Sequence, residues 1–202
     1  MGQFAIFNLQ FFMEYIGEVI ESSTMQFTAE SRELHGASPF GSFVRVDSQP
    51  LIFGVVFNVY THSVEQNRRP TAYGKTEEEL RLEQPQIFEL LKTEFQAVIV
   101  GYQDGINGPK QLLPPQPPRI HQFVYQCRPE EVRRFTSSWD YLRTILAVPK
   151  IPTDELLIAA VRSALSVRYG ETWYLVQTGK EISRLIKNDY DRLSSIVRRI
   201  SQ

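Results

Sequence analysis

The chain has 202 residues, of which 42% are hydrophobic and 22% are charged, as in ordinary folded proteins. This composition excludes extensive disorder, and a formal net charge of −1 excludes a protein that binds nucleic acid through its overall charge. The single cysteine, Cys127, excludes an intramolecular disulfide and favours a reducing, cytoplasmic location.

The first twelve residues, MGQFAIFNLQFF, are apolar but lack the basic start and the cleavage site of a secretion signal. They are also too short to cross a bilayer, so the sequence predicts no membrane span there. We expect residues 1–12 to form a flexible arm, with Met1 and Met13 as alternative starts of the protein.

Residues 13–127 have the pattern of a small β-barrel. Apolar and polar residues alternate loosely at 15–21, 25–30 and 43–47, and turn residues separate these runs. Residues 51–60 are nearly all apolar, which is typical of a central strand covered on both faces.

A helical insertion is predicted within this barrel at residues 76–95. Thr76 has the spacing of a capping box, and Pro85 divides the insertion into two short helices. The run AVIVGY at 97–102 predicts a further strand, and residues 121–127 predict the last one.

Residues 128–202 are predicted to be mainly helical. Pro129 suits the first position of a helix, and apolar residues follow at helical spacing as far as Gly170. Residues 172–177 indicate a strand or an extended segment, and Thr178 then begins a long amphipathic helix. The sequence therefore predicts an α+β fold: a small closed antiparallel β-barrel with a helical insertion, followed by a mainly α-helical C-terminal part.

Charge is distributed unevenly between the two parts. Residues 1–127 hold 9 Lys and Arg against 14 Asp and Glu, whereas residues 128–202 hold 13 against 9. This asymmetry supports a division into two domains near residue 128, and it favours self-association of unlike faces.

The order of these segments resembles a known barrel. IGEVIESSTMQFTAE resembles the opening of the HerA–ATP synthase (HAS) barrel, and FGSFVRV followed by LIFGVVFNV resembles its next pair of strands. In HerA-type DNA translocases and rotary ATP synthase catalytic subunits, this barrel precedes a phosphate-binding motor domain. The resemblance covers residues 15–135 and implies a domain that forms a ring or collar between subunits.

The phosphate-binding motif of those motors, GxxxxGK[ST], does not occur in this sequence. YGKT at 73–76 would need its first glycine at Arg69, and GKE at 179–181 would need one at Tyr174. We therefore expect no ATPase activity and no nucleotide cofactor.

Other catalytic and metal-binding patterns are also missing from the sequence. His35, His62 and His121 lie far apart along the chain, so no zinc site is expected. We expect Cys127 to be a small buried hydrophobe rather than a nucleophile. The sequence thus predicts no catalytic, metal-binding or cofactor-binding residues and no enzyme activity.

The segment 29–43 is the first candidate for an interaction. It is either a barrel loop whose arginine pairs with Glu30 or Glu33, or a contact surface, because arginine and aromatic residues are enriched at interface cores. A catalytic pocket in this loop is a third alternative. The candidate interaction residues are Arg32, Glu33, His35, Phe40 and Phe43.

The second candidate is the basic C-terminal stretch. Acidic residues alternate with basic ones there and no aromatic–basic pattern is present, so a charged face on a packed or oligomerising helix is favoured over a nucleic-acid site. The candidate residues are Arg184, Lys187, Arg198 and Arg199.

The leading hypothesis is a non-catalytic assembly module that uses a HAS-like barrel for self-association or for docking to a partner complex. Exposed strand edges and the final helix would supply the contact surfaces. The alternative is a nucleic-acid-associated accessory factor that works with a separate ATPase.

Overall fold

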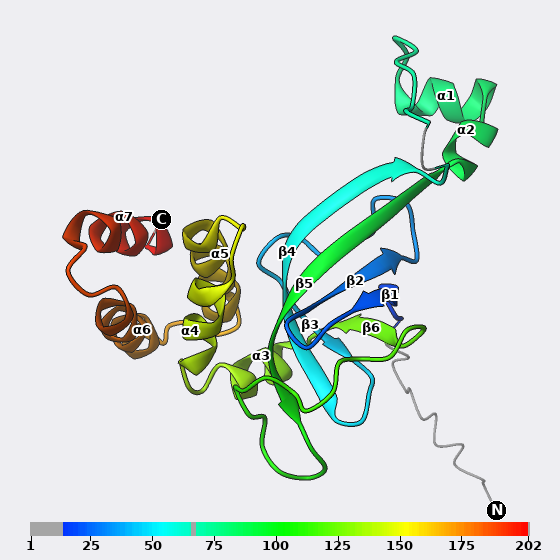
Figure 1. Ribbon diagram of the computed structural model, residues 1–202. Helices are drawn as coiled ribbons and strands as arrows, with labels where there is room; N and C mark the ends of the chain where they lie inside the picture. Colours follow the sequence, from blue (N-terminus) through cyan, green and yellow to red (C-terminus); the bar gives the residue numbers. More distant parts are fainter. Residues whose placement is uncertain (1–13, 66–67, 202) are drawn as a thin grey trace, which may run out of the picture.

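The computed structural model describes residues 14–65 and 68–201, which form six strands and seven helices. All six strands close into one antiparallel barrel in the order β1-β2-β5-β4-β3-β6 (Figure 1). The strands are β1 (Gly17–Ser22), β2 (Gln26–Ser31), β3 (Phe43–Val46), β4 (Leu51–Ser63), β5 (Leu91–Gln103) and β6 (Phe123–Gln126). The predicted fold class, a closed antiparallel barrel followed by helices, is confirmed.

Alternating apolar side chains fill the inside of the barrel, because successive residues of a strand point to opposite faces. Gly17 lets β1 approach β2 closely, since a Cβ at this position would lie 2.5 Å from the carbonyl oxygen of Glu30. Gly17 also pairs with Val124 of β6, and this pairing closes the barrel. The interior side chains are Val19, Phe27, Ala29, Val44, Val46, Ile52, Val56, Phe95, Ala97, Ile99 and Val124.

The middle parts of β4 and β5 are buried on both faces. Ile52 and Ile99 point into the barrel, whereas Phe53 and Val98 point outward into a second apolar cluster shared with the helices. This double burial explains why the sequence is apolar without alternation here, and it confirms a central strand covered on both sides.

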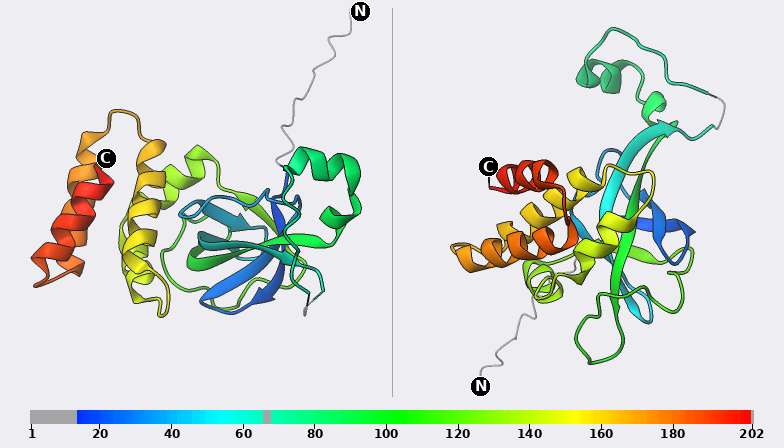
Figure 2. Two further views of the ribbon diagram at one scale, coloured as in Figure 1. Left: turned by 90° about the horizontal axis from the view of Figure 1, so that it is seen from above. Right: turned by 60° about the vertical axis from the view of Figure 1, so that its left-hand side comes forward.

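Five helices stack in two layers against one side of the barrel (Figure 2). The helices next to the barrel are α3 (Pro129–Phe135), α4 (Asp140–Ala147) and α5 (Thr153–Ser166). The outer layer consists of α6 (Thr172–Leu185) and α7 (Tyr190–Ile200), both of which contact α5.

Aromatic rings join the helices to the barrel. The ring of Phe135, the last residue of α3, lies 4.8 Å from that of Phe53 and 6.1 Å from that of Phe43, between ring centroids. Gly101 of β5 makes room for this ring, because a Cβ at Gly101 would lie 2.7 Å from Phe135. One buried cluster thus crosses the predicted boundary near residue 128, and the division into two domains stays a prediction.

The helical insertion is shorter than the predicted range of 76–95. It consists of α1 (Glu77–Glu83) and α2 (Gln86–Glu89), and β5 begins at Leu91. The capping box at Thr76 and the break at Pro85 are confirmed. The helix predicted for residues 91–95 is wrong because these residues pair with β4. This long-range pairing outweighs their local helical spacing.

The strand or extended segment predicted at 172–177 is wrong, because these residues form the first half of α6. Tyr174, Thr178 and Ile182 are buried at a spacing of four residues, which places them on one helical face. Thr178 is therefore not a helix cap; its hydroxyl accepts a hydrogen bond from Trp139 Nε1 at 2.9 Å. Burial of this face against the neighbouring helices outweighs the strand propensity of the aromatic run.

The single long helix predicted from Thr178 onward is also wrong. The chain turns between α6 and α7, where Asn188 has a φ of 66°. Asp189 then caps α7, since its carboxylate accepts a hydrogen bond from the Arg192 backbone N–H at 3.1 Å.

The predicted arm at residues 1–12 lies outside the described residues. Within residues 14–65 and 68–201, no helix is both long enough and apolar enough to cross a membrane.

We expect Phe135→Ala to lower the free energy of unfolding by about 3–5 kcal/mol, because it leaves a cavity between the helices and the barrel. Urea denaturation followed by circular dichroism measures this change. The control is Tyr169→Ala, whose side chain is 93% exposed and whose loss should change stability by less than about 0.5 kcal/mol. Equal stability of the two variants would contradict the joining role of Phe135.

Candidate interaction surfaces

The hairpin of β4 and β5 extends beyond the barrel as a projecting arm (Figure 1). Residues 58–63 of β4 pair with residues 91–96 of β5, whereas β3 pairs with β4 only at 52–55. Among the described strands, none pairs with the other edge of β4 beyond Val56. The barrel itself is closed, but within the arm the outer edge of β4 remains a strand edge to which another chain could pair.

The tip of the arm, as described for residues 64–65 and 68–90, carries α1 and α2 with little internal packing. Neither helix has a buried residue. Surface contacts hold the tip instead: Arg81 pairs with Glu77 and its guanidinium lies 4.3 Å from the centroid of the Phe88 ring. A hollow of about 210 Å³ lies between Tyr73, Leu80, Phe88 and their neighbours.

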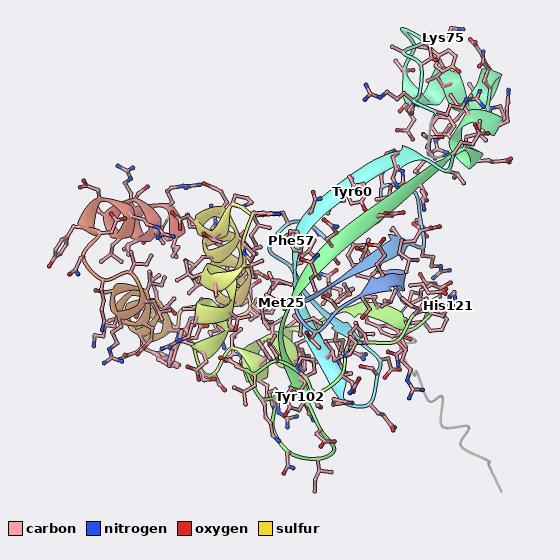
Figure 3. The ribbon with its side chains drawn as sticks, in the orientation of Figure 1. Met25, Phe57, Tyr60, Lys75, Tyr102 and His121 are labelled. Atoms are coloured by element: carbon pink, nitrogen blue, oxygen red, sulfur yellow. The ribbon has the colours of Figure 1, made fainter. Side chains whose placement is uncertain are left out.

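A polar network crosses the two strands of the arm at Glu94, and its member Tyr60 on β4 is labelled in Figure 3. Tyr60 Oη donates a hydrogen bond of 2.6 Å to Glu94 Oε2, and Lys92 Nζ lies 2.6 Å from Glu94 Oε1. His62 Nε2 lies 3.2 Å from the same Oε1 atom. The Glu94 carboxylate is nearly buried, so these partners replace the water that it loses.

The network shifts the pKa values of its members. Burial alone would raise the pKa of Glu94, but the hydrogen bonds from Lys92 and Tyr60 outweigh it and hold this pKa below its ordinary value. The hydrogen bond to Glu94 raises the pKa of Lys92, and burial together with the same carboxylate raises the pKa of Tyr60. Glu94 is therefore ionised and Lys92 charged at neutral pH.

We expect Glu94→Gln to lower the free energy of unfolding at pH 7 by about 1–3 kcal/mol, because Lys92 and Tyr60 lose a charged acceptor. The pKa of Glu94 is lowered in the folded state, so its contribution is present above the ordinary value of 4.5 and is lost as the pH falls below it. Urea denaturation between pH 3 and pH 7 measures the difference.

The control for this pH series is Glu89→Gln, which changes an exposed carboxylate in α2. The difference between wild type and Glu94→Gln should shrink toward acid pH, while the control stays close to wild type throughout. A Glu94→Gln difference that is constant with pH would contradict the network.

The candidate loop at 29–43 is only partly a surface. Arg32 Nη1 pairs with Glu14 Oε2 at 3.2 Å rather than with Glu30 or Glu33, and Arg32 and Glu33 line a hollow of about 140 Å³. His35 has a φ of 64°, and its backbone N–H donates to Thr93 Oγ1 at 2.9 Å, so this residue fastens the loop to the arm.

The two aromatic candidates of this loop differ in burial. Phe40 is exposed, as a contact residue should be. Phe43 is only 2% exposed and packs against Phe135 and Tyr141, so it belongs to the joint between barrel and helices. Its selection as a surface residue is wrong, because Phe43 starts a strand whose outer face the helices cover.

The basic C-terminal residues divide into internal and external groups. Arg199 Nη1 donates to Glu155 Oε1 of α5 at 2.7 Å, and Arg192 of the same helix binds Asp154. These two arginines thus fasten α7 to α5. Arg184 pairs with Glu181 on its own helix, whereas Lys187 and Arg198 are exposed and form no ion pair with any described residue.

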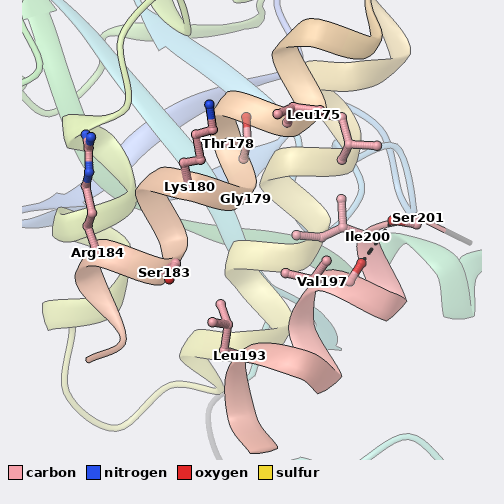
Figure 4. Close-up of a pocket in the computed structure, with 11 residues that line it drawn as sticks. Leu175, Thr178, Gly179, Lys180, Ser183, Arg184, Leu193, Val197, Ile200 and Ser201 are labelled. Atoms are coloured by element: carbon pink, nitrogen blue, oxygen red, sulfur yellow. Dashed lines mark hydrogen bonds between the residues drawn. The ribbon is translucent and has the colours of Figure 1, made fainter. Parts of the chain in front are cut away.

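An apolar groove of about 680 Å³ runs between α6 and α7 (Figure 4). Leu193, Val197 and Ile200 of α7 point toward α6, which supplies Leu175 and Val176. Lys180, Ser183 and Arg184 stand along the α6 side. The sequence did not predict this groove, because the misassigned segment 172–177 hid the helical face that carries Val176 and Lys180.

In the described ranges, no three His, Cys, Asp or Glu side chains come together in an arrangement that could hold a metal ion. Cys127 is buried, as predicted, and this burial raises the pKa of its thiol, which keeps it protonated at neutral pH.

These features define a small β-barrel module with a projecting arm and a two-layered helical cover. Residues 16–105 match the family of the HAS barrel domain. The chain therefore contains a HAS barrel domain, which confirms the resemblance noted from its opening strands. The matched range spans β1–β5, while β6 and α3–α7 follow it. None of the curated proteins compared with the chain matches it.

Proposed function

We propose that this protein is a non-catalytic assembly module, which uses its HAS barrel to associate with copies of itself or to dock on a partner complex. The observation that carries this proposal is the projecting arm. It is continuous with two barrel strands, leaves one edge of β4 unpaired among the described strands, and ends in helices without a buried residue.

Apolar side chains on the arm support a docking role. Val59 on β4 is 41% exposed, and Val64, Tyr73 and Leu90 are exposed around the tip. An unpaired edge of this kind can accept a strand from another chain, whose main chain completes the hydrogen bonds. Apolar side chains beside the edge would add burial to that contact.

The alternative, an accessory factor that binds nucleic acid beside a separate ATPase, receives less support. Arg192 and Arg199 bind Asp154 and Glu155 within the chain, so they do not contribute freely to a phosphate-binding surface. Binding to a phosphate backbone through the remaining cations would weaken steeply with salt.

Native mass measurement of the purified full chain, together with affinity purification from cells, tests the proposal. We expect either multiples of the 23.4 kDa chain or a stable complex with a partner. A monomer that co-purifies with nothing would contradict it. Salt-sensitive retention on DNA or RNA, without any protein complex, would favour the alternative.

Val59→Lys should weaken the association that involves the arm, because a lysine beside an open edge opposes the addition of a strand. Sedimentation velocity of the variant and of the retained complex measures the effect. Tyr169→Lys introduces the same side chain at an exposed position between α5 and α6 and serves as the matched control. Loss of association in both variants, or in neither, would count against the arm as the docking surface.

A further inference from the structure

The groove between α6 and α7 has apolar walls that nothing in the described chain covers. Val176 is 55% exposed and Val197 is 38% exposed, although both belong to the face that lines the groove. Fully burying such a side chain stabilises a contact by about 1.5–3 kcal/mol. The groove therefore has the properties of a docking site for an apolar side chain on another element.

Gly179 lies in the wall of this groove, inside α6. A Cβ at this position would meet no atom within 4 Å, so the fold itself leaves room for a larger residue. Glycine inside a helix is unfavourable relative to alanine. Its presence lets another chain approach the backbone of α6 closely.

The tip of the arm carries a side chain that would fill the groove. Leu82 of α1 is 86% exposed and lies one helical turn after Glu78, on the same face. Glu77 and Glu83 pair with Arg81 and Lys75, whereas Glu78 forms no ion pair with any described residue. The exposed face of α1 therefore carries Leu82 and, one turn before it, the carboxylate of Glu78, which has no ion-pair partner among the described residues.

The groove presents the complementary pair. Lys180 lies one turn after Val176 on α6, is exposed, and forms no ion pair among the described residues. An apolar and an acidic residue four positions apart on α1 thus match an apolar and a basic residue four positions apart on α6.

The wider surfaces agree in charge. At the tip, Glu78, Glu79 and Glu89 form no ion pair with a described residue, against Arg69 alone among the basic side chains. Within residues 172–201, Lys180, Lys187 and Arg198 form none, whereas the three remaining arginines pair with acidic residues of the same chain. Complementary charge of this kind favours encounter between the two surfaces.

The two surfaces lie at different ends of the molecule, with the barrel and α4–α5 between them (Figures 1 and 2). They therefore meet between copies rather than within one chain. We infer that α1 of one copy docks in the α6–α7 groove of a second copy, with Leu82 against Val176 and Val197 and with Glu78 paired with Lys180. This contact rests on the proposed function and names a second copy as the partner. Because it joins unlike faces, it is heterologous and leads to a ring or an open chain.

Charge exchange tests the pairing. Lys180→Glu and Glu78→Lys should each weaken self-association roughly tenfold or more, because each places like charges together. The double variant should recover most of the loss, as measured by sedimentation velocity over a concentration series. Two losses that simply add in the double variant would overturn the pairing.

Mixing tests the head-to-tail geometry. Leu82→Asp removes the α1 contact and Val197→Asp removes the groove, so each variant alone should be a monomer. Mixed in equal amounts, they retain one intact surface each and should form a heterodimer and nothing larger. Both positions are exposed, and circular dichroism confirms folding. Ile106→Asp changes an exposed loop residue elsewhere and should leave association unchanged.

Gly179→Ala separates docking from folding. It should raise the midpoint of urea unfolding, since alanine favours the helix and fits the available space. It should also weaken self-association severalfold, because its methyl group occupies the approach to α6. Unchanged or tighter association in this variant would overturn the inference.

The two proposals fail differently. A wild-type chain that stays monomeric at all concentrations, or that associates normally after Leu82→Asp and Val197→Asp, overturns the α1–groove contact. The assembly function still stands in those cases if the chain associates through another surface or is retained by a partner complex.

Discussion

The double burial of β4 and β5 is the constraint on which the rest of the structure depends. Ile52 and Ile99 complete the barrel interior, while Phe53 and Val98 on the opposite face need a cover. Helices α3–α5 supply that cover, and α6 and α7 pack on α5. The barrel therefore determines where the helical layers lie, and the same two strands continue into the arm. Both candidate surfaces are positioned by one hairpin.

The sequence predicted the barrel well, because period-two alternation and turn residues are local signals that the closed sheet preserves. Thr76 and Pro129 likewise act through the backbone next to them. Prediction failed where distant contacts decide the outcome. Residues 91–95 have helical spacing but pair with β4, and residues 172–177 have strand propensity but bury Tyr174 against Trp139. Both contacts, with β4 and with Trp139, join residues more than 25 positions apart, so a short stretch of sequence does not reveal them.

The candidate surfaces were harder to predict for the same reason. Composition locates charged residues but does not show which of them are paired, so Arg199, which binds Glu155, looked equivalent to the exposed Lys187. Phe43 looked like a loop aromatic because its covering helices lie about 90 residues later in the sequence. The groove needs two helices placed side by side, which no single amphipathic pattern describes.

The length of β5 gives the molecule a mechanical property. This strand starts at Leu91, beside the tip helices, and passes Gly101, which touches the ring of Phe135. At about 3.3 Å per residue, the strand connects these points over roughly 33 Å, and its pairing with β4 shifts register twice along the way. A load applied at the tip would therefore pass along a hydrogen-bonded hairpin directly into the joint that holds the helices. In an assembly under tension, the arm would transmit force from its tip to the aromatic contacts of Phe135.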